Sequence, residues 1–165
     1  MRLPGRTTRL TFRAWRDDDP LAPALFGDPR VSALVGGPFD ADQIRARLAF
    51  ELTNQRDSEI AYWPISQGDI DVGCCGLKPR DPARNIVELG FYLLPSAWGQ
   101  GYAVEAGHSV IAHAFDVLGV AELFAGHHPE NHASRKTLEK LGFVYTHEEL
   151  YPPTGLMHPG YRLTK

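Results

Sequence analysis

The residues from Glu88 to Ala106 have the composition and spacing of a turn that can bind a phosphate. An apolar segment ends at Pro95, two glycines follow at Gly99 and Gly101, and helical spacing begins directly afterwards. The first N–H groups of a helix have no backbone partners, and its dipole presents its positive end there, so main chain alone can hold an anionic phosphate. Glycine lets a ligand approach the backbone closely. The same pattern also fits a plain strand-to-helix turn without a ligand.

The sequence limits which phosphate compound such a turn could take. It has no Gly-Lys-Ser/Thr phosphate loop, which argues against a nucleoside-triphosphate hydrolase. The pair Gly99 and Gly101 resembles the start of a dinucleotide fingerprint, but Val104 stands where the third glycine should be. At least three predicted strands precede the turn and about two follow it, too few for the alternating halves of a dinucleotide-binding fold.

Hydrophobic periodicity predicts the elements that position this turn. Alternation of apolar and polar residues indicates strands, and apolar residues three or four apart indicate helices. The expected strands cover residues 9–15, 59–66, 71–78, 85–94, 121–128, 143–149 and 160–163. The expected helices run from Pro20 towards Phe26, from Asp40 past Leu52, over residues 101–118 and from Asn131 to Leu141, with a proline-rich loop over residues 151–159. Without repeats or a linker-like composition, residues 1–165 are expected to form a single domain.

Composition restricts the class of protein. The formal charge is -3, with 17 basic residues scattered among 20 acidic ones, which argues against a nucleic-acid partner. No apolar run approaches the length of a membrane span, and no segment resembles a secretion signal, so a cytoplasmic protein without a membrane partner is expected. Cys74 and Cys75 are expected in the core. His128 and His132 have helical ligand spacing, but Pro129 separates them, so no metal is expected.

Several motifs occur in a fixed order. The segment from Glu88 to Ala106 is followed by Asn131-His132-Ala133-Ser134 and by Glu139-Lys140-Leu141-Gly142-Phe143. Together with the opening residues 8–19, they resemble the GNAT acyl-CoA N-acyltransferases, particularly the RimJ/RimL-like branch, over nearly the whole chain. The resemblance implies an α+β fold with a mixed, mostly antiparallel central sheet flanked by helices. It also implies that two strands, ending near Leu94 and His128, splay apart.

The resemblance further implies that acetyl-CoA is the co-substrate and lies between the splayed strands. Its pantetheine arm would bond to the backbone of Leu93 and Leu94, and Asn131 would also contact the cofactor. The turn that contains Trp98 and Gly99 would place four backbone N–H groups against the pyrophosphate: those of Gln100, Gly101, Tyr102 and Ala103. Trp98 departs from the general family pattern, which has Gln or Arg at this position. Because the cradle is made of backbone N–H groups, this departure does not change the expected phosphate site.

Acetyl transfer to an amine needs a neutral nitrogen, whereas amines are largely protonated at neutral pH. By resemblance, Glu88 is the catalytic base, often acting through water. Many family members carry a tyrosine acid at the position of Leu138, so Ser134 is the candidate replacement as a catalytic residue. Tyr92 and Tyr145 are alternative acids. Both residues of the Asn-x-x-Ser motif also fit a structural role, in which Asn131 is a helix cap and Ser134 is a small residue of the first turn.

The acceptor side is expected to be walled by residues 29–39 and 151–159. Aromatic residues are its candidate substrate-binding residues: Trp15, Phe39, Tyr62, Trp63 and Tyr151. His127 or His128 could also touch the substrate. The sequence thus predicts an N-acetyltransferase that acetylates a primary amine, either a protein N-terminal α-amine or a small molecule, by direct attack. The alternative is a catalytically inactive acyl-CoA-binding module, motivated by Leu138, and both a monomer and a homodimer stay open.

Overall fold

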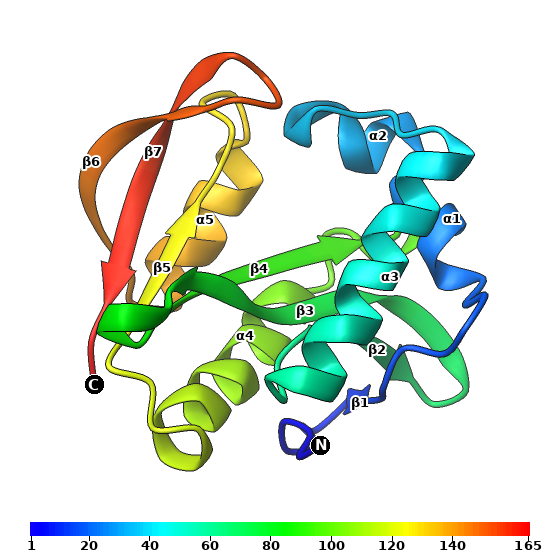
Figure 1. Cartoon of the computed structure of the whole chain (residues 1–165), viewed down its shortest axis with the longest axis horizontal. Helices are drawn as coiled ribbons and strands as arrows, with labels where there is room; N and C mark the ends of the chain where they lie inside the picture. Colours follow the sequence, from blue (N-terminus) through cyan, green and yellow to red (C-terminus); the bar gives the residue numbers. More distant parts are fainter.

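A computed structural model describes all residues from Met1 to Lys165. Its centre is one seven-stranded sheet with strand order β1-β2-β3-β4-β5-β7-β6 (Figure 1). The strands are β1 (Thr11–Phe12), β2 (Tyr62–Gln67), β3 (Ile70–Asp81), β4 (Ile86–Leu93), β5 (Glu122–Gly126), β6 (Val144–Tyr151) and β7 (Leu156–Leu163). All neighbouring strands are antiparallel except β4 and β5, which are parallel. The predicted α+β class with a mixed, mostly antiparallel sheet is confirmed.

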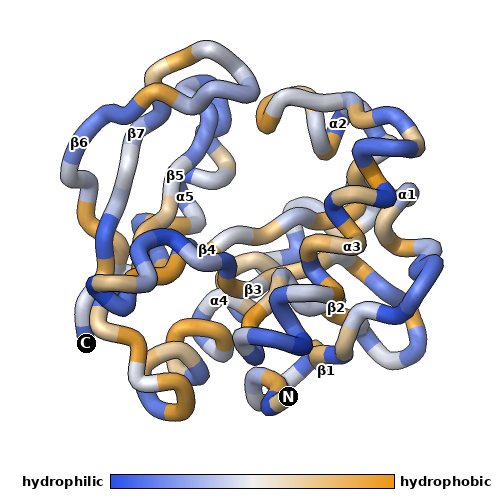
Figure 2. Tube along the Cα trace, viewed as in Figure 1, coloured by the Kyte–Doolittle hydropathy of each residue, from blue (hydrophilic) through white to orange (hydrophobic).

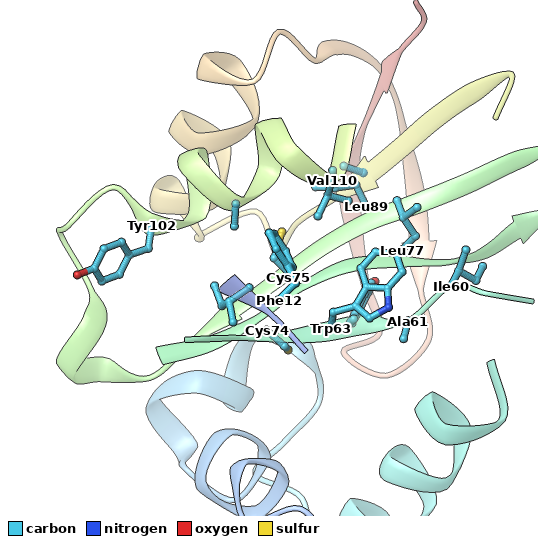
Figure 3. Close-up of a cluster of buried hydrophobic side chains, with 14 of the residues drawn as sticks. Phe12, Ile60, Ala61, Trp63, Cys74, Cys75, Leu77, Leu89, Tyr102 and Val110 are labelled. Carbon is cyan, nitrogen blue, oxygen red and sulfur yellow. The ribbon is translucent and has the colours of Figure 1, made fainter. Parts of the chain in front are cut away.

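Helices cover both faces of this sheet. The longer ones are α1 (Leu21–Phe26), α3 (Ala41–Asp57), α4 (Tyr102–Ala112) and α5 (His132–Lys140), with the single turn α2 (Pro29–Ser32). Three 3₁₀ turns, η1 (Ala33–Val35), η2 (Pro82–Arg84) and η3 (Pro95–Ala97), and a π turn, η4 (His113–Val117), complete the structure. Figure 3 shows α4 and α5 on one side of the strands and α1 to α3 on the other. No helix is both long enough and apolar enough to cross a membrane.

The two adjacent cysteines show how the sheet separates these layers. Cys74 and Cys75 are both completely buried and unpaired, and successive side chains of a strand point to opposite faces (Figure 3). Cys75 faces α4, near Val110, whereas Cys74 faces α1 and α3. Hydrophobic residues accordingly gather along the central strands and α4, while hydrophilic ones dominate the upper part of the outer strand β6 (Figure 2).

Local sequence signals explain where the helices begin. Asp40 and Gln43 form a capping box at the start of α3, in which each side chain bonds to the backbone of the other residue. The side chain of Asp28 accepts from the N–H of Arg30 and caps α2. Asp28 therefore separates α1 from α2.

Three expectations about element boundaries were wrong. The first strand has only two residues, although the N–H of the next residue, Arg13, still donates to the carbonyl of Pro64 at 3.0 Å. The last strand begins at Leu156, so the predicted loop over 151–159 shrinks to residues 152–155. The helix predicted over residues 101–118 is α-helical only to Ala112 and continues to Val117 as the π turn.

Candidate active site

The parallel strands β4 and β5 separate after a short region of pairing. Ile86, Val87 and Glu88 pair with β5, and the last pair joins Glu88 to Phe124. Beyond it the two strands diverge, which Figure 1 shows as β4 and β5 pointing in different directions. A cleft of about 700 Å³ lies along this opened seam and extends to the N-terminal ends of α4 and α5.

The cleft brings together most of the predicted site residues. Those that line it are Tyr62, Glu88, Tyr92, Leu93, Trp98, Gly99, Gly101, Tyr102, Ala103, His127, His128, Asn131 and Ser134. Leu94, Gln100, Trp15, Phe39, Trp63, Tyr145 and Tyr151 do not line it. The first group comes from β2, β4, β5 and two helix starts, so only the tertiary structure assembles it.

The end of β4 divides its hydrogen bonds between a neighbouring strand and the seam. The N–H of Leu94 donates to the carbonyl of Val72 at 2.9 Å, so it is already satisfied. Because backbone groups alternate in direction along an antiparallel pair, those of Leu93 point into the seam. Its carbonyl accepts the indole N–H of Trp98 at 2.9 Å. Of the two residues predicted to bond to a ligand, Leu94 thus uses its N–H within the sheet, and Leu93 is the one whose N–H is directed to the seam.

The turn before α4 has the backbone conformation that its glycines allow. Gly99 and Gly101 have φ values of 74° and 77°, in the left-handed region. No side chain caps α4 at Gly101, and a Cβ added at Gly99 would meet nothing within 4 Å. The first N–H groups of α4 are thus open to a ligand from the seam.

Arg9 holds this turn in place, a role that the sequence analysis missed. Its Nη1 donates to the carbonyl of Gln100 at 3.0 Å, and its guanidinium lies 4.6 Å from the centre of the Tyr102 ring. Glu105, in the first turn of α4, accepts from both the Nε and the backbone N–H of Arg9. The Gln100 side chain bonds to the carbonyl of Ser96 instead of entering the cleft.

Glu88 lies on the floor of the cleft with two basic neighbours. Lys78, directly opposite on β3, places its Nζ 2.9 Å from Oε1, and Nη1 of Arg80 lies 3.9 Å from Oε2. The side chain of Glu88 is 17% exposed. Neither basic residue was identified from the sequence, because the register of β3 against β4 decides which residue stands opposite Glu88.

Two tyrosines share the face of Glu88. A Cβ at Gly90 would lie 2.5 Å from the hydroxyl of Tyr62, so the absence of a side chain there makes room for this phenol. The Tyr92 ring lies 5.9 Å from that of Tyr62. Burial raises the pKa of both hydroxyls, so both stay neutral at pH 7 and are available as hydrogen-bond donors.

At the start of α5, the Oδ1 of Asn131 accepts from the N–H of Ser134 at 3.0 Å. Asn131 is therefore a helix cap that also lines the cleft, and Ser134 stands in the first turn with its hydroxyl bonded to no protein group. Leu138 is 1% exposed and lines the cleft one turn later. Tyr145 instead lines a second cavity, of about 670 Å³, and packs edge-on against Tyr161, so it is not available to the cleft.

Both ring nitrogens of the buried His127, which follows β5, have hydrogen-bonding partners. The Nδ1 of His127 lies 2.7 Å from the carbonyl of His128, which requires a proton on that nitrogen. Its Nε2 lies 3.2 Å from the hydroxyl of Tyr161. Burial lowers the pKa of His127, so its ring is neutral at pH 7. No group of three or more His, Cys, Asp or Glu side chains is arranged to hold a metal ion.

Of the aromatic residues predicted at the acceptor side, only Tyr62 reaches the cleft. Trp15 is buried and donates its indole N–H to the Tyr62 carbonyl at 2.7 Å. Phe39 packs under Arg47, and Tyr151 stacks on His158. Trp63 is also core. Aliphatic side chains of α2 and η1 line this end of the cleft instead: Val31, Leu34 and Val35.

Comparisons with known proteins agree with this geometry. Residues 9–144 match a family model described as the acetyltransferase (GNAT) domain. The chain is 29% identical over 142 residues to the N-acetyltransferase p20 of Bacillus licheniformis, an alignment that covers 83% of this chain and 80% of that protein.

Solved structures show the same arrangement of elements. The acetyltransferase from Agrobacterium tumefaciens str. C58 superposes with a TM-score of 0.84 at 27% identity, covering 100% of this chain and 96% of that one. RimL, the ribosomal L7/L12 α-N-protein acetyltransferase solved in complex with coenzyme A, gives a TM-score of 0.79 at 15% identity, covering 96% and 95%. At that identity the likeness to RimL concerns the fold alone.

Proposed function

This chain belongs to the GNAT acetyltransferase family, and we propose on that basis that it transfers the acetyl group of acetyl-CoA to a primary amine by direct attack. The observation that carries the proposal is the seam between β4 and β5, which opens beside the uncapped start of α4. We place the chain in the RimJ/RimL-like branch as a single domain over residues 1–165. The acceptor in this proposal is a protein N-terminal α-amine or a small molecule.

The open backbone groups of the cleft suit a CoA thioester. The N–H of Leu93 would bond to the pantetheine arm, in the manner of an added strand. The N–H groups at Gly101, Tyr102 and Ala103 would receive the pyrophosphate at the helix start. Acetyl-CoA, when bound, supplies the thioester carbonyl that the amine attacks.

Side chains of the cleft would accept and donate the protons that this reaction transfers. Lys78 occupies Oε1 of Glu88, so Oε2 would receive the proton that the attacking amine loses, directly or through water. The hydroxyl of Ser134 would return a proton to the leaving sulfur, with the buried hydroxyl of Tyr92 as the alternative donor. The amine loses one proton to Glu88 and the leaving thiolate gains one proton from the hydroxyl donor, so the protons taken up and released are equal in number.

Coenzyme A is expected to raise the melting temperature of the protein, and Gly101→Ala is expected to weaken its binding at least about tenfold. The added methyl group costs about 1 kcal/mol in a left-handed conformation and keeps the pyrophosphate from the backbone. Gly119→Ala is the matched control, because Gly119 has a φ of 66° and open space around it but lies outside the cleft. Equal CoA affinity of the two variants, by calorimetry, would contradict the cradle.

One observation favours a second candidate, an acyl-CoA-binding module without turnover. Buried Leu138 lines the cleft where many family members have a tyrosine acid. Both candidates predict CoA binding, but only the enzyme releases free thiol from acetyl-CoA when amines are supplied. A panel of primary amines, followed by thiol release, separates them.

A further inference from the structure

Arg47, on α3, is held in one orientation without an anionic partner. Its guanidinium carbon lies 4.7 Å from the centre of the Phe26 ring and 4.5 Å from that of Phe39. The residue is half-buried, makes no side-chain hydrogen bond and has no carboxylate oxygen within 4.0 Å. Two aromatic rings thus fix the position of this cation by cation–π attraction but do not neutralise it.

The other arginines of the chain are either paired or fully exposed. Arg30, which also lines the cleft, is bound through two nitrogens by Asp28, and Arg80 lies between Glu88 and Glu149. Those without a carboxylate partner, Arg6 and Arg84, are exposed to water. Arg47 is therefore the one arginine that is partly withdrawn from water and has no counter-ion. Removing a charge from water is costly unless it is paired, so this position favours an anion.

Arg47 does not line the cleft itself, but it contacts a residue that packs against the lining. Phe26, under its guanidinium, packs edge-on against Tyr92 with ring centres 5.4 Å apart, and Tyr92 lines the cleft. From Glu88 to Tyr92 the strand advances about 13 Å, so Tyr92 and the Phe26 ring packed against it lie toward the far end of β4 from the proposed base.

The acidic residue closest in sequence on the same helix does not satisfy this cation. Glu51 follows Arg47 by one turn, but its carboxylate accepts the N–H of Tyr62 at 2.8 Å and forms no ion pair. The N–H donors of the planar Arg47 guanidinium are therefore available to a ligand. A carboxylate matches their geometry, since it can accept two parallel hydrogen bonds.

We propose that Arg47 binds a carboxylate of the acceptor, so that the acceptors are amines carrying a free carboxylate at the far end from the reacting nitrogen. Amino acids with a terminal side-chain amine and short peptides with a free C-terminus belong to this class. The aliphatic side chains of Val31, Leu34 and Val35 would contact the part of the molecule between the two ends. This inference rests on the proposed acetyl transfer, whose amine site it completes.

The test compares free acids with their amides on the CoA-loaded protein by calorimetry. The probes are 6-aminohexanoate against 6-aminohexanamide, and the dipeptide Ala-Phe against Ala-Phe amide. We expect the parent to bind the acid of at least one pair at least ten times more tightly than its amide. Arg47→Met, which keeps an apolar stem, is expected to abolish this preference, and Arg47→Lys to retain part of it.

Arg45→Met is the matched control, because Arg45 is exposed and paired with Asp42 on the same helix. It should keep the full preference, and no variant should change the affinity for CoA. Equal binding of acid and amide by the parent, including no detectable binding of either, overturns the inference. So does an acid preference that survives Arg47→Met, or a loss of CoA affinity in that variant.

Failure of the proposed function gives a different result. In that case CoA causes no thermal shift, or no amine of either kind releases thiol. If Arg47→Met does not fold, the parent comparison and Arg47→Lys still decide the outcome, because the acid preference is a ratio that a general loss of stability does not move.

Discussion

Glu88→Gln is expected to lower kcat for amine acetylation at least about 100-fold at pH 7.5, the usual contribution of a general base. The substitution keeps the size of the side chain but removes its ability to take up a proton and its charge, and with the charge the ion pair with Lys78. Affinity for CoA should stay unchanged, because the proposed cradle consists of backbone groups of the turn before α4. Steady-state kinetics with the best amine of the panel, together with CoA calorimetry, measures both quantities.

Glu148→Gln is the control for this prediction. Glu148 is an exposed glutamate on β6 that lines the second cavity and not the cleft, so its variant should keep nearly full activity. A loss below about tenfold for Glu88→Gln would remove Glu88 from the mechanism. A large loss of CoA affinity in the same variant would show that the carboxylate supports the cleft rather than the proton transfer.

Glu51→Gln is expected to raise the free energy of unfolding at pH 8 by about 3 kcal/mol relative to the parent. Burial raises the pKa of Glu51 to about 7, from its ordinary value of 4.5. The folded state therefore binds a proton more readily than the unfolded state, and this carboxyl group costs stability as pH rises from about 4.5 to about 7. Below that range both states are protonated and the cost disappears. Glutamine is always neutral and keeps an oxygen for the N–H of Tyr62.

Urea unfolding of parent and variant at a series of pH values checks this prediction. Buried histidines such as His113 and His158, whose pKa is lowered, make the folded state less stable as pH falls. The pH dependence of the free energy of unfolding of the parent therefore contains contributions from these histidines as well as from Glu51. The difference between variant and parent isolates Glu51. It should grow between about pH 5 and pH 7 and then level off, whereas exposed Glu130→Gln should show no such rise. A constant difference across the range would mean that Glu51 titrates normally.

The acceptor side shows where sequence reasoning failed and why. Trp15 and Tyr151 are aromatic residues that were predicted at the acceptor side. Trp15 instead packs into the core against Tyr62, and Tyr151 stacks on His158. An aromatic residue has the same periodicity whether it lines a cavity or fills a core. Tyr145 was placed on the correct strand, yet the face of that strand directs it to the second cavity.

Local chemistry, by contrast, determined much of the molecule from the sequence alone. Left-handed glycines, the capping box at Asp40 and the cap at Asn131 depend on neighbours within a few residues, so the turn before α4 and the helix starts could be located there. The tertiary structure alone decided the ion pair of Lys78 with Glu88, the clamp of Arg9 on Gln100 and the unpaired cation of Arg47. Each of these depends on strand register or on packing between layers, which join residues far apart in the chain, and periodicity within one segment carries no information about either.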